Sequence, residues 1–225
     1  MGGDNNVVKD STFSGHFVDG IVMTDDNPTI GGTGESSSNN CILRNTITST
    51  GFGLGRQNGT GIWMNSESNS NLVGGNSISG HPENGIAIFN AGDNVVEGNS
   101  VFSNGQGGVI IWDAQASGFI ASRGGRPEND LIRGDDFHNY ASNGAVNIRG
   151  AKDTHILDNF MRNSANSVFN VGVIIDEPSP RFRAAITTTS SSMGASRSSG
   201  SPLSAQRSST SRSLKARAIA PSEKV

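Results

Sequence analysis

The sequence predicts an all-β protein that folds as a solenoid of about six short coils, each pairing in parallel with the next. The chain of 225 residues holds 30 glycines and many asparagines and serines. This composition disfavours long helices, because Gly loses backbone entropy in a helix and Asn prefers turns. A nine-residue pattern also recurs six times, and a second short apolar strand follows every copy. Short strands that recur in this way suit a stack of coils better than a sandwich or barrel.

The first part of each unit has apolar residues at two fixed positions, on either side of a polar turn. Its copies are NVVKDSTFS (6–14), NCILRNTIT (40–48), NLVGGNSIS (71–79), NVVEGNSVF (94–102), DLIRGDDFH (130–138) and THILDNFMR (154–162). The third residues, among them Val73, Val96 and Ile132, are expected to stack as one apolar column. The eighth residues, which include Ile78, Val101 and Phe137, are expected to form another. Neighbouring coils would then lie about 4.8 Å apart.

The polar position between these strands predicts a ladder of side-chain amides. It is occupied in turn by Ser11, Asn45, Asn76, Asn99, Asp135 and Asn159. An Asn side chain at a bend can bond to backbone groups of the adjacent coils that the bend leaves without partners. The column is therefore predicted to be structural.

The second strand of each unit follows a corner that usually contains Gly. These strands are GIVM (20–23), GIWM (61–64), GIAI (85–88), GVII (108–111), AVNI (145–148) and GVII (172–175). Gly is expected at this corner because it adopts backbone angles that a side chain would forbid.

The composition changes sharply near Pro178 and predicts two regions. Residues 1–178 form the repeat domain, whereas residues 179–225 are rich in Ser and Arg and lack hydrophobic periodicity, which predicts a disordered tail. Nine basic and eighteen acidic residues precede Glu177, for a formal charge of −9, and the remainder carries +6. The basic tail has no interleaved aromatic residues and no RNA-binding module, so a nucleic-acid partner is disfavoured.

The N-terminus has no signal-peptide pattern, and no apolar run anywhere in the sequence is long enough to span a membrane. The single cysteine, Cys41, excludes an internal disulfide. The first copy of the repeat begins at residue 6 without a capping helix. An oligomer or a longer parent chain is therefore expected to cover the open N-terminal coil.

The units N-x-[VI]-x-x-N-x-[IVF] and G-[IV]-x-[IM] cover about residues 6 to 176 and resemble the right-handed parallel β-helix repeat proteins. This pectin-lyase-like superfamily includes NosD-like domains, pectate lyases, polygalacturonases, alginate lyases and epimerases, and phage glycanases. The resemblance implies an extracellular protein that binds or modifies an extended polysaccharide, as a lyase or a glycoside hydrolase. The alternative is a non-catalytic structural or adhesion module. A lyase would neutralise a uronate with calcium or Arg, whereas a hydrolase needs two carboxylates.

Family motifs do not assign a subfamily. RGDDF (133–137) and the two SGH fragments (14–16 and 79–81) are similar to polygalacturonase motifs, but their order is reversed and the companion motifs are absent. Asp135 also falls in the amide column, which favours a turn residue. His16 and His81 are expected to be solvent-facing loop residues. The only tyrosine, Tyr140, lacks the Asp and His partners of the alginate-epimerase signature.

The candidate site follows the second strand of each coil, where the residues vary in chemistry. This position holds Thr24, Asn65, Phe89, Trp112, Arg149 and Asp176. If it faces outward, Trp63, Phe89 and Trp112 form an aromatic substrate-binding patch beside the candidate catalytic residues Asp113, Arg149 and Asp176. The strand spacing would put Asp113 and Asp176 or Glu177 on the order of 10 Å apart, near the range of an inverting pair. The alternative is that the rings pack under the inserted loops at 25–39 and 114–128, and that the charges form an exposed ion pair.

Overall fold

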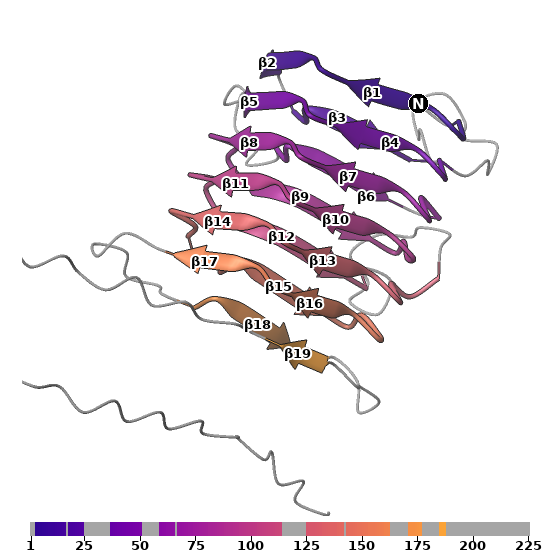
Figure 1. Ribbon diagram of the computed structural model, residues 1–225, viewed down its shortest axis with the longest axis vertical. Helices are drawn as coiled ribbons and strands as arrows, with labels where there is room; N and C mark the ends of the chain where they lie inside the picture. The colour runs from indigo at the N-terminus through magenta and orange to yellow at the C-terminus, as the bar shows by residue number, and fades with distance from the viewer. Residues whose placement is uncertain are drawn as a thin grey trace, which may run out of the picture. The chain divides into compact units, whose positions relative to one another are not determined.

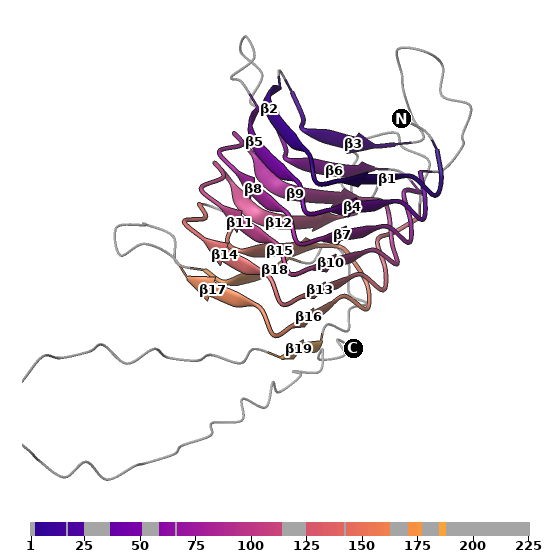
Figure 2. The ribbon, with the colours of Figure 1, turned by 45° about the horizontal axis from the view of Figure 1, so that its top comes forward.

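The computed structural model describes residues 3–16, 18–24, 37–50, 59–65, 67–113, 125–141, 143–162, 171–176 and 185–187. This part of the chain contains strands β1 to β19 and no helix. The strands pair in parallel and form three sheets, which we name sheets A, B and C (Figure 1). Consecutive strands belong to different sheets, so the chain passes through A, B and C before it starts the next coil (Figure 2).

Each complete coil contributes one strand to every sheet. Sheet A contains β1 (Val7–Lys9), β4 (Cys41–Leu43), β7 (Leu72–Gly74), β10 (Val95–Glu97), β13 (Leu131–Arg133), β16 (His155–Leu157) and β19 (Ala185–Thr187). Sheet B contains β2 (Thr12–His16), β5 (Thr46–Thr50), β8 (Ser77–Ser79), β11 (Ser100–Phe102), β14 (Asp136–His138) and β17 (Phe160–Arg162). Sheet C contains β3 (Ile21–Met23), β6 (Ile62–Asn65), β9 (Asn84–Phe89), β12 (Gly107–Trp112), β15 (Val146–Arg149) and β18 (Val173–Asp176). The predicted solenoid of six coils is confirmed.

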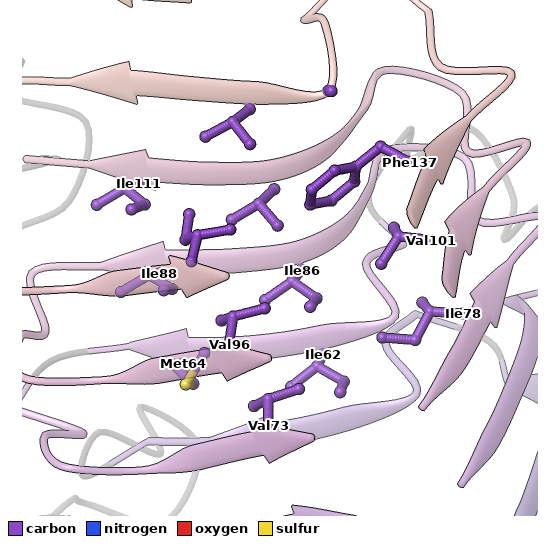
Figure 3. Close-up of a cluster of buried hydrophobic side chains, with 14 of the residues drawn as sticks. Ile62, Met64, Val73, Ile78, Ile86, Ile88, Val96, Val101, Ile111 and Phe137 are labelled. Atoms are coloured by element: carbon purple, nitrogen blue, oxygen red, sulfur yellow. The ribbon is translucent and has the colours of Figure 1, made fainter. Parts of the chain in front are cut away.

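The interior consists of continuous apolar columns, one residue per coil. In sheet A the predicted column of Val73, Val96 and Ile132 is in register and fully buried. The predicted column of sheet B and the inward residues of sheet C are buried with it: Ile78, Val101, Phe137, Ile62, Met64, Ile86, Ile88, Val109 and Ile111 (Figure 3). Removing these side chains from water is the main favourable term that holds the coils together.

The predicted amide column forms a hydrogen-bonded ladder between sheets A and B. Asn45 donates from its backbone N and its Nδ2 to Oδ1 of Asn76, at 2.8 and 3.1 Å. Asn76 makes the same pair of bonds to Oδ1 of Asn99, both at 2.9 Å. The Nδ2 of Asn76 also donates to the backbone oxygen of Ile42 in the preceding coil, at 2.9 Å. These bonds confirm the structural role predicted for the column.

A second ladder, which was not predicted, precedes sheet A. It joins the first residue of successive units, through Asn6, Asn40, Asn71, Asn94 and Asp130. In both ladders the residue just before the rung has a positive φ, as at Asp93 (57°) and Gly98 (64°). One left-handed residue turns the chain so that the next side chain points along the solenoid axis to its equivalent in the neighbouring coil.

The corner between sheets B and C places His81 in the interior, so the prediction of a solvent-facing residue is wrong there. Its side chain is 1% exposed, its backbone N donates to Oδ1 of Asn104 at 3.1 Å, and its Nε2 lies 3.1 Å from the backbone oxygen of Ile47. The left-handed Gly80 (φ 74°) stands just before His81, as a left-handed residue stands just before each rung of the two ladders. This turn of the backbone directs the His81 side chain away from solvent. Burial lowers the pKa of His81 to about 4, so the ring is neutral at pH 7. His16 is half-buried.

Glycine stands before the apolar residues of sheet C, but not for the predicted reason: Gly20 and Gly61 come just before β3 and β6, and Gly85 and Gly108 lie near the start of β9 and β12. None of these four has a positive φ. A Cβ at Gly61 would lie 2.5 Å from the backbone oxygen of Gly85 and 2.5 Å from Cγ2 of Ile78. The close approach of the neighbouring coil and of sheet B therefore leaves no room for a side chain at Gly61, whereas the equivalent position further along the solenoid accommodates Ala145.

The predicted domain boundary at residue 178 and most of the predicted tail, 179–225, lie outside the described residues. Within that stretch only β19 is described, and it pairs in parallel with β16 to extend sheet A. No helix that is long and apolar enough to cross a membrane occurs in the described ranges.

Candidate functional site

The outward face of sheet C holds the predicted substrate-binding residues. Side chains alternate along a strand, so the residues between the buried ones point away from the interior. The pairing register joins Phe89 to Trp112, Trp112 to Arg149, and Arg149 to Asp176 on four successive coils. Trp63 occupies the same face two residues earlier in its strand, where it pairs with Ala87.

The three predicted aromatic residues form a continuous row. The ring centroids of Trp63 and Phe89 are 6.0 Å apart with an interplanar angle of 76°. Those of Phe89 and Trp112 are 5.1 Å apart with an angle of 87°. Both pairs have the edge-to-face geometry that aromatic quadrupoles favour. All three side chains are half-buried, so the row is an apolar wall that crosses three coils and remains partly accessible.

A groove of about 220 Å³ lies beside this wall. It is lined by Val18, Asp19, Thr60, Trp63, Glu83, Asn84, Ala87, Phe89, Gln106, Ile110, Trp112, Asn143 and Arg149. The polar residues stand where the strands of sheet C begin, and Phe89, Trp112 and Arg149 stand where they end. Ala87 and Ile110 lie between the two edges and are buried. The groove therefore has one polar edge, one aromatic edge and an apolar floor.

Two carboxyl groups, Asp19 and Glu83, stand at the polar edge. Burial raises the pKa of Asp19, and a hydrogen bond from the backbone N of Thr60 at 2.8 Å partly offsets that effect. Burial also raises the pKa of Glu83, and the charge of Asp19 raises it further, while a hydrogen bond with the Thr60 side chain lowers it. Thr60 thus bonds to both carboxyl groups and ties them to one corner of the solenoid.

Uncharged amides continue the polar edge along the solenoid. The backbone N of Gln106 donates to the backbone oxygen of Glu83, and the backbone N of Asn143 donates to the backbone oxygen of Gln106, each at 2.7 Å. The three residues are therefore equivalent on successive coils. The Nδ2 of Asn143 donates to Oε1 of Gln106 at 3.1 Å and approaches Oδ1 of Asn84 at 3.5 Å. This edge presents a row of amide donors and acceptors to the groove.

The structure separates the three predicted catalytic residues. Arg149 reaches the groove, and its guanidinium carbon lies 5.8 Å from the ring centroid of Trp112. Asp113 and Asp176 do not line the groove, although they stand on the coils before and after Arg149. The backbone N of Asp113 donates to the backbone oxygen of Arg149 at 2.8 Å. The side chain of Asp176 is exposed. Glu177, and most of the loops proposed to cover the rings, lie outside the described residues.

The calcium implied for a lyase has no matching set of ligands in the described part of the chain. No group of three or more His, Cys, Asp or Glu side chains there is able to hold a metal ion. Calcium takes six to eight oxygen ligands, several of them carboxylates, whereas the groove offers Asp19 and Glu83. These residues do not fit a calcium site.

Asp19 and Glu83 were not predicted as site residues. Both lie in the corner between sheets B and C. This corner contains no recurring apolar position, so hydrophobic periodicity does not identify it. A usable signal was present nonetheless: Glu83, Gln106 and Asn143 each stand two residues before the corner position that Gly85, Gly108 and Ala145 occupy. A column of polar residues that borders an outward strand face predicts a lined groove.

The comparisons with known proteins agree with this architecture. The family model described as "Right handed beta helix region" matches residues 1–117. The solved structure of the periplasmic alginate epimerase AlgG is similar at a TM-score of 0.50 and 14% identity, covering 82% of this chain and 42% of that one. The A-module of the Azotobacter vinelandii mannuronan C-5 epimerase AlgE4 has a TM-score of 0.44 and 14% identity, covering 81% of this chain and 58% of that one. No curated protein matches the chain.

The family match and the likeness to AlgG establish the fold and leave the activity open. At 14% identity a structural likeness reports architecture alone, and the chain spans 42% and 58% of the two epimerase chains. The family model covers more than half of the 225 residues and extends from the first coil into the groove-forming strands of sheet C. This chain belongs to the right-handed β-helix family.

Proposed function

We propose that this chain binds an extended polysaccharide in the groove on the outward face of sheet C. The observation that supports the proposal is the row formed by Trp63, Phe89 and Trp112 across three coils. Sugar rings present apolar C–H faces that pack on aromatic rings, and the amides at the opposite edge suit their hydroxyl groups. The similar fold of AlgG, named as an alginate epimerase, is consistent with a glycan ligand.

Glycoside hydrolysis is a second candidate function, and the carboxyl groups in the groove favour it. A general acid needs a raised pKa to hold its proton at the working pH, and both burial and the negative charge of Asp19 raise the pKa of Glu83. Asp113, Arg149 and Asp176 stay a proposed catalytic set, in which two carboxyl groups flank a cation. A lyase is the less favoured reaction, because it would need a calcium or arginine cluster around a uronate.

The binding proposal predicts that Trp112→Ala weakens glycan binding about tenfold or more, because it removes the central stacking surface. Phe102→Ala is the matched control: Phe102 lies on β11 in sheet B, where its ring stacks on His138 at 4.6 Å, away from the groove. Affinity electrophoresis of the full chain in gels that contain alginate, polygalacturonate, mannan, xylan or dextran measures both variants. Equal retention of the wild type and Trp112→Ala on every glycan that binds would contradict the proposal.

A further inference from the structure

The charged groups of the groove are unequal in sign. Two carboxyl groups, Asp19 and Glu83, face a single cation, Arg149, and no lysine is present in the lining. The two carboxyl groups stand at the polar edge, where a sugar chain would place its hydroxyl groups. Arg149 stands at the opposite edge, over the ring of Trp112. A ligand that lies along the polar edge therefore meets negative charge and no compensating cation there.

The surroundings of the two carboxyl groups strengthen the repulsion that their negative charge exerts on a ligand carboxylate. Both side chains are partly buried. Each has a hydrogen bond to Thr60, which partly offsets the effect of burial on its pKa. Their pKa values are raised, which reports poor solvation of the ionised forms. A poorly solvated charge is weakly screened, so a ligand carboxylate placed beside it would be repelled more strongly than at an open surface.

The charge of Arg149 does not offset this repulsion. Asp176 is its register partner on one neighbouring coil, and Asp113 follows Trp112, its register partner on the other. The edge that contains Arg149 is thus bordered by further carboxylates. The whole region before Glu177 carries a formal charge of −9, so the long-range field also disfavours a polyanion.

We infer that the groove accepts an uncharged glycan and rejects polyuronates, with Asp19 and Glu83 as the residues that determine this choice. The inference depends on the proposed function, because it names the substrate class of the same groove. Neutral sugar hydroxyl groups can donate to the two carboxyl groups and exchange hydrogen bonds with Asn84, Gln106 and Asn143. Rejection follows from like charge at a desolvated site, which is a repulsive element of specificity.

The reaction class follows from the substrate class. Elimination by a lyase requires a carboxylate or its ester on the carbon that loses the proton, since only that group acidifies the C–H bond. A neutral glycan has no such group. If the groove is catalytic, the reaction on a neutral glycan is hydrolysis: water adds to the anomeric carbon and gives a proton to an ionised carboxylate, the bond to the bridging oxygen breaks, and that oxygen receives a proton from a second, protonated carboxyl group.

The test compares the full-length wild type with the variant Asp19→Asn/Glu83→Gln, which keeps the size of both side chains. Retention by neutral mannan, xylan and dextran is measured against alginate, polygalacturonate and cationic chitosan by affinity electrophoresis at 0.15 M salt. The wild type is expected to prefer a neutral glycan over the polyuronates by about tenfold or more, and the variant is expected to lose most of that preference. The basic segment from residue 177 onward is identical in both proteins, so the difference between them reports the groove.

The binding results distinguish a failure of the inferred glycan preference from a failure of the proposed function. Preferential binding of alginate, polygalacturonate or chitosan by the wild type overturns the inference and leaves glycan binding intact. An unchanged preference in a variant with a wild-type circular dichroism spectrum also overturns it, because the discrimination then comes from elsewhere. Should Glu83→Gln unfold the chain, the single variant Asp19→Asn provides the same comparison. Absence of binding to every glycan overturns the proposed function itself.

Discussion

Asp135 occupies a rung of the ladder between sheets A and B in place of Asn. Its Oδ1 accepts from the backbone N of Asn99 at 2.7 Å and from Nδ2 of Asn99 at 2.9 Å, as an amide oxygen would. Its Oδ2 is buried without a hydrogen-bond partner. The equivalent atom of Asn99, on the preceding rung, is Nδ2, which donates to the backbone oxygen of Val73. Burial raises the pKa of Asp135 to about 7, and that of Asp130 in the other ladder to about 8. A protonated Asp supplies the O–H donor that the missing amide would supply.

These two residues contribute a loss of stability as the pH rises from about 4 to about 8, whereas the buried neutral His81 contributes a gain between about 4 and 6.5 that wild type and variant share. The unfolded carboxyl groups titrate near 3.8, so in this window the folded chain binds more protons at these two residues than the unfolded chain. Asp130→Asn/Asp135→Asn should therefore reduce the loss of unfolding free energy between pH 5 and pH 8.5 by about 1 to 3 kcal/mol. Urea titrations at the two pH values, followed by circular dichroism, measure this loss.

Asp158→Asn is the control for that experiment, because it removes an exposed carboxylate next to a rung and leaves every rung in place. It measures how far the removal of one exposed carboxylate by itself changes the result. Asp19 and Glu83 contribute with the same sign, since their pKa values are also raised, so the double variant keeps part of the slope. A slope identical to that of the wild type would show that the two ladder carboxyl groups are ionised in the folded chain.

At the level of elements, the corners of a coil use glycine in two different ways. Gly98 precedes a rung at φ 64°, and a Cβ there would meet nothing within 4 Å. Equivalent positions in other coils already hold Asp10, Arg44 and Asp158, at φ values of 53°, 53° and 51°. Gly61 has an ordinary φ but no room for a Cβ. One corner thus selects for backbone conformation, and the other selects for space.

This difference predicts opposite tolerance to substitution. Gly98→Asn should change the free energy of unfolding by less than about 1 kcal/mol, because Asn accepts a left-handed conformation. Gly61→Ala should lower it by about 2 kcal/mol or more, because neither a backbone oxygen nor a packed Ile78 side chain can move away cheaply. Equilibrium denaturation of both variants tests the pair. Equal losses would mean that conformation and space matter alike at both corners.

At the level of the whole molecule, the repeat made most of the architecture predictable. The apolar columns, the ladder of Asn45, Asn76 and Asn99, and the outward position of Phe89 and Trp112 all follow from one alignment of the copies. Such regularity is informative because every coil must present the same groups to its neighbour. The inward direction of His81 was not predictable from apolar periodicity, since a left-handed corner sets it.

The groove was only partly predictable, for a related reason. Its aromatic edge lies on regular strands and appeared in the alignment, whereas Asp19 and Glu83 lie in the corners between sheets B and C, where no apolar position recurs. Their neighbourhood is created by stacking three coils, with Thr60 between them, and the polar column of Glu83, Gln106 and Asn143 indicates only one side of it. The burial that raises their pKa values is likewise a property of the assembled solenoid.

The catalytic proposal for Asp113, Arg149 and Asp176 predicts that alanine substitution of each lowers turnover at least about a hundredfold. Turnover of the glycan panel is read by reducing ends and by the absorbance of unsaturated products, with and without calcium. Full activity in all three variants would remove this set. A loss in Glu83→Gln alone would instead assign the general acid to the polar edge of the groove.

The ladders also bear on how such a chain diversifies. Successive rungs are joined by the same hydrogen bonds although they stand 34, 31, 23, 36 or 24 positions apart in the sequence. Each rung needs only its two neighbours, so residues gained or lost between rungs leave the stack unchanged. Evolution can therefore lengthen or shorten the segments between rungs without a compensating change in the core, and ligand preference can diverge while the scaffold is inherited intact.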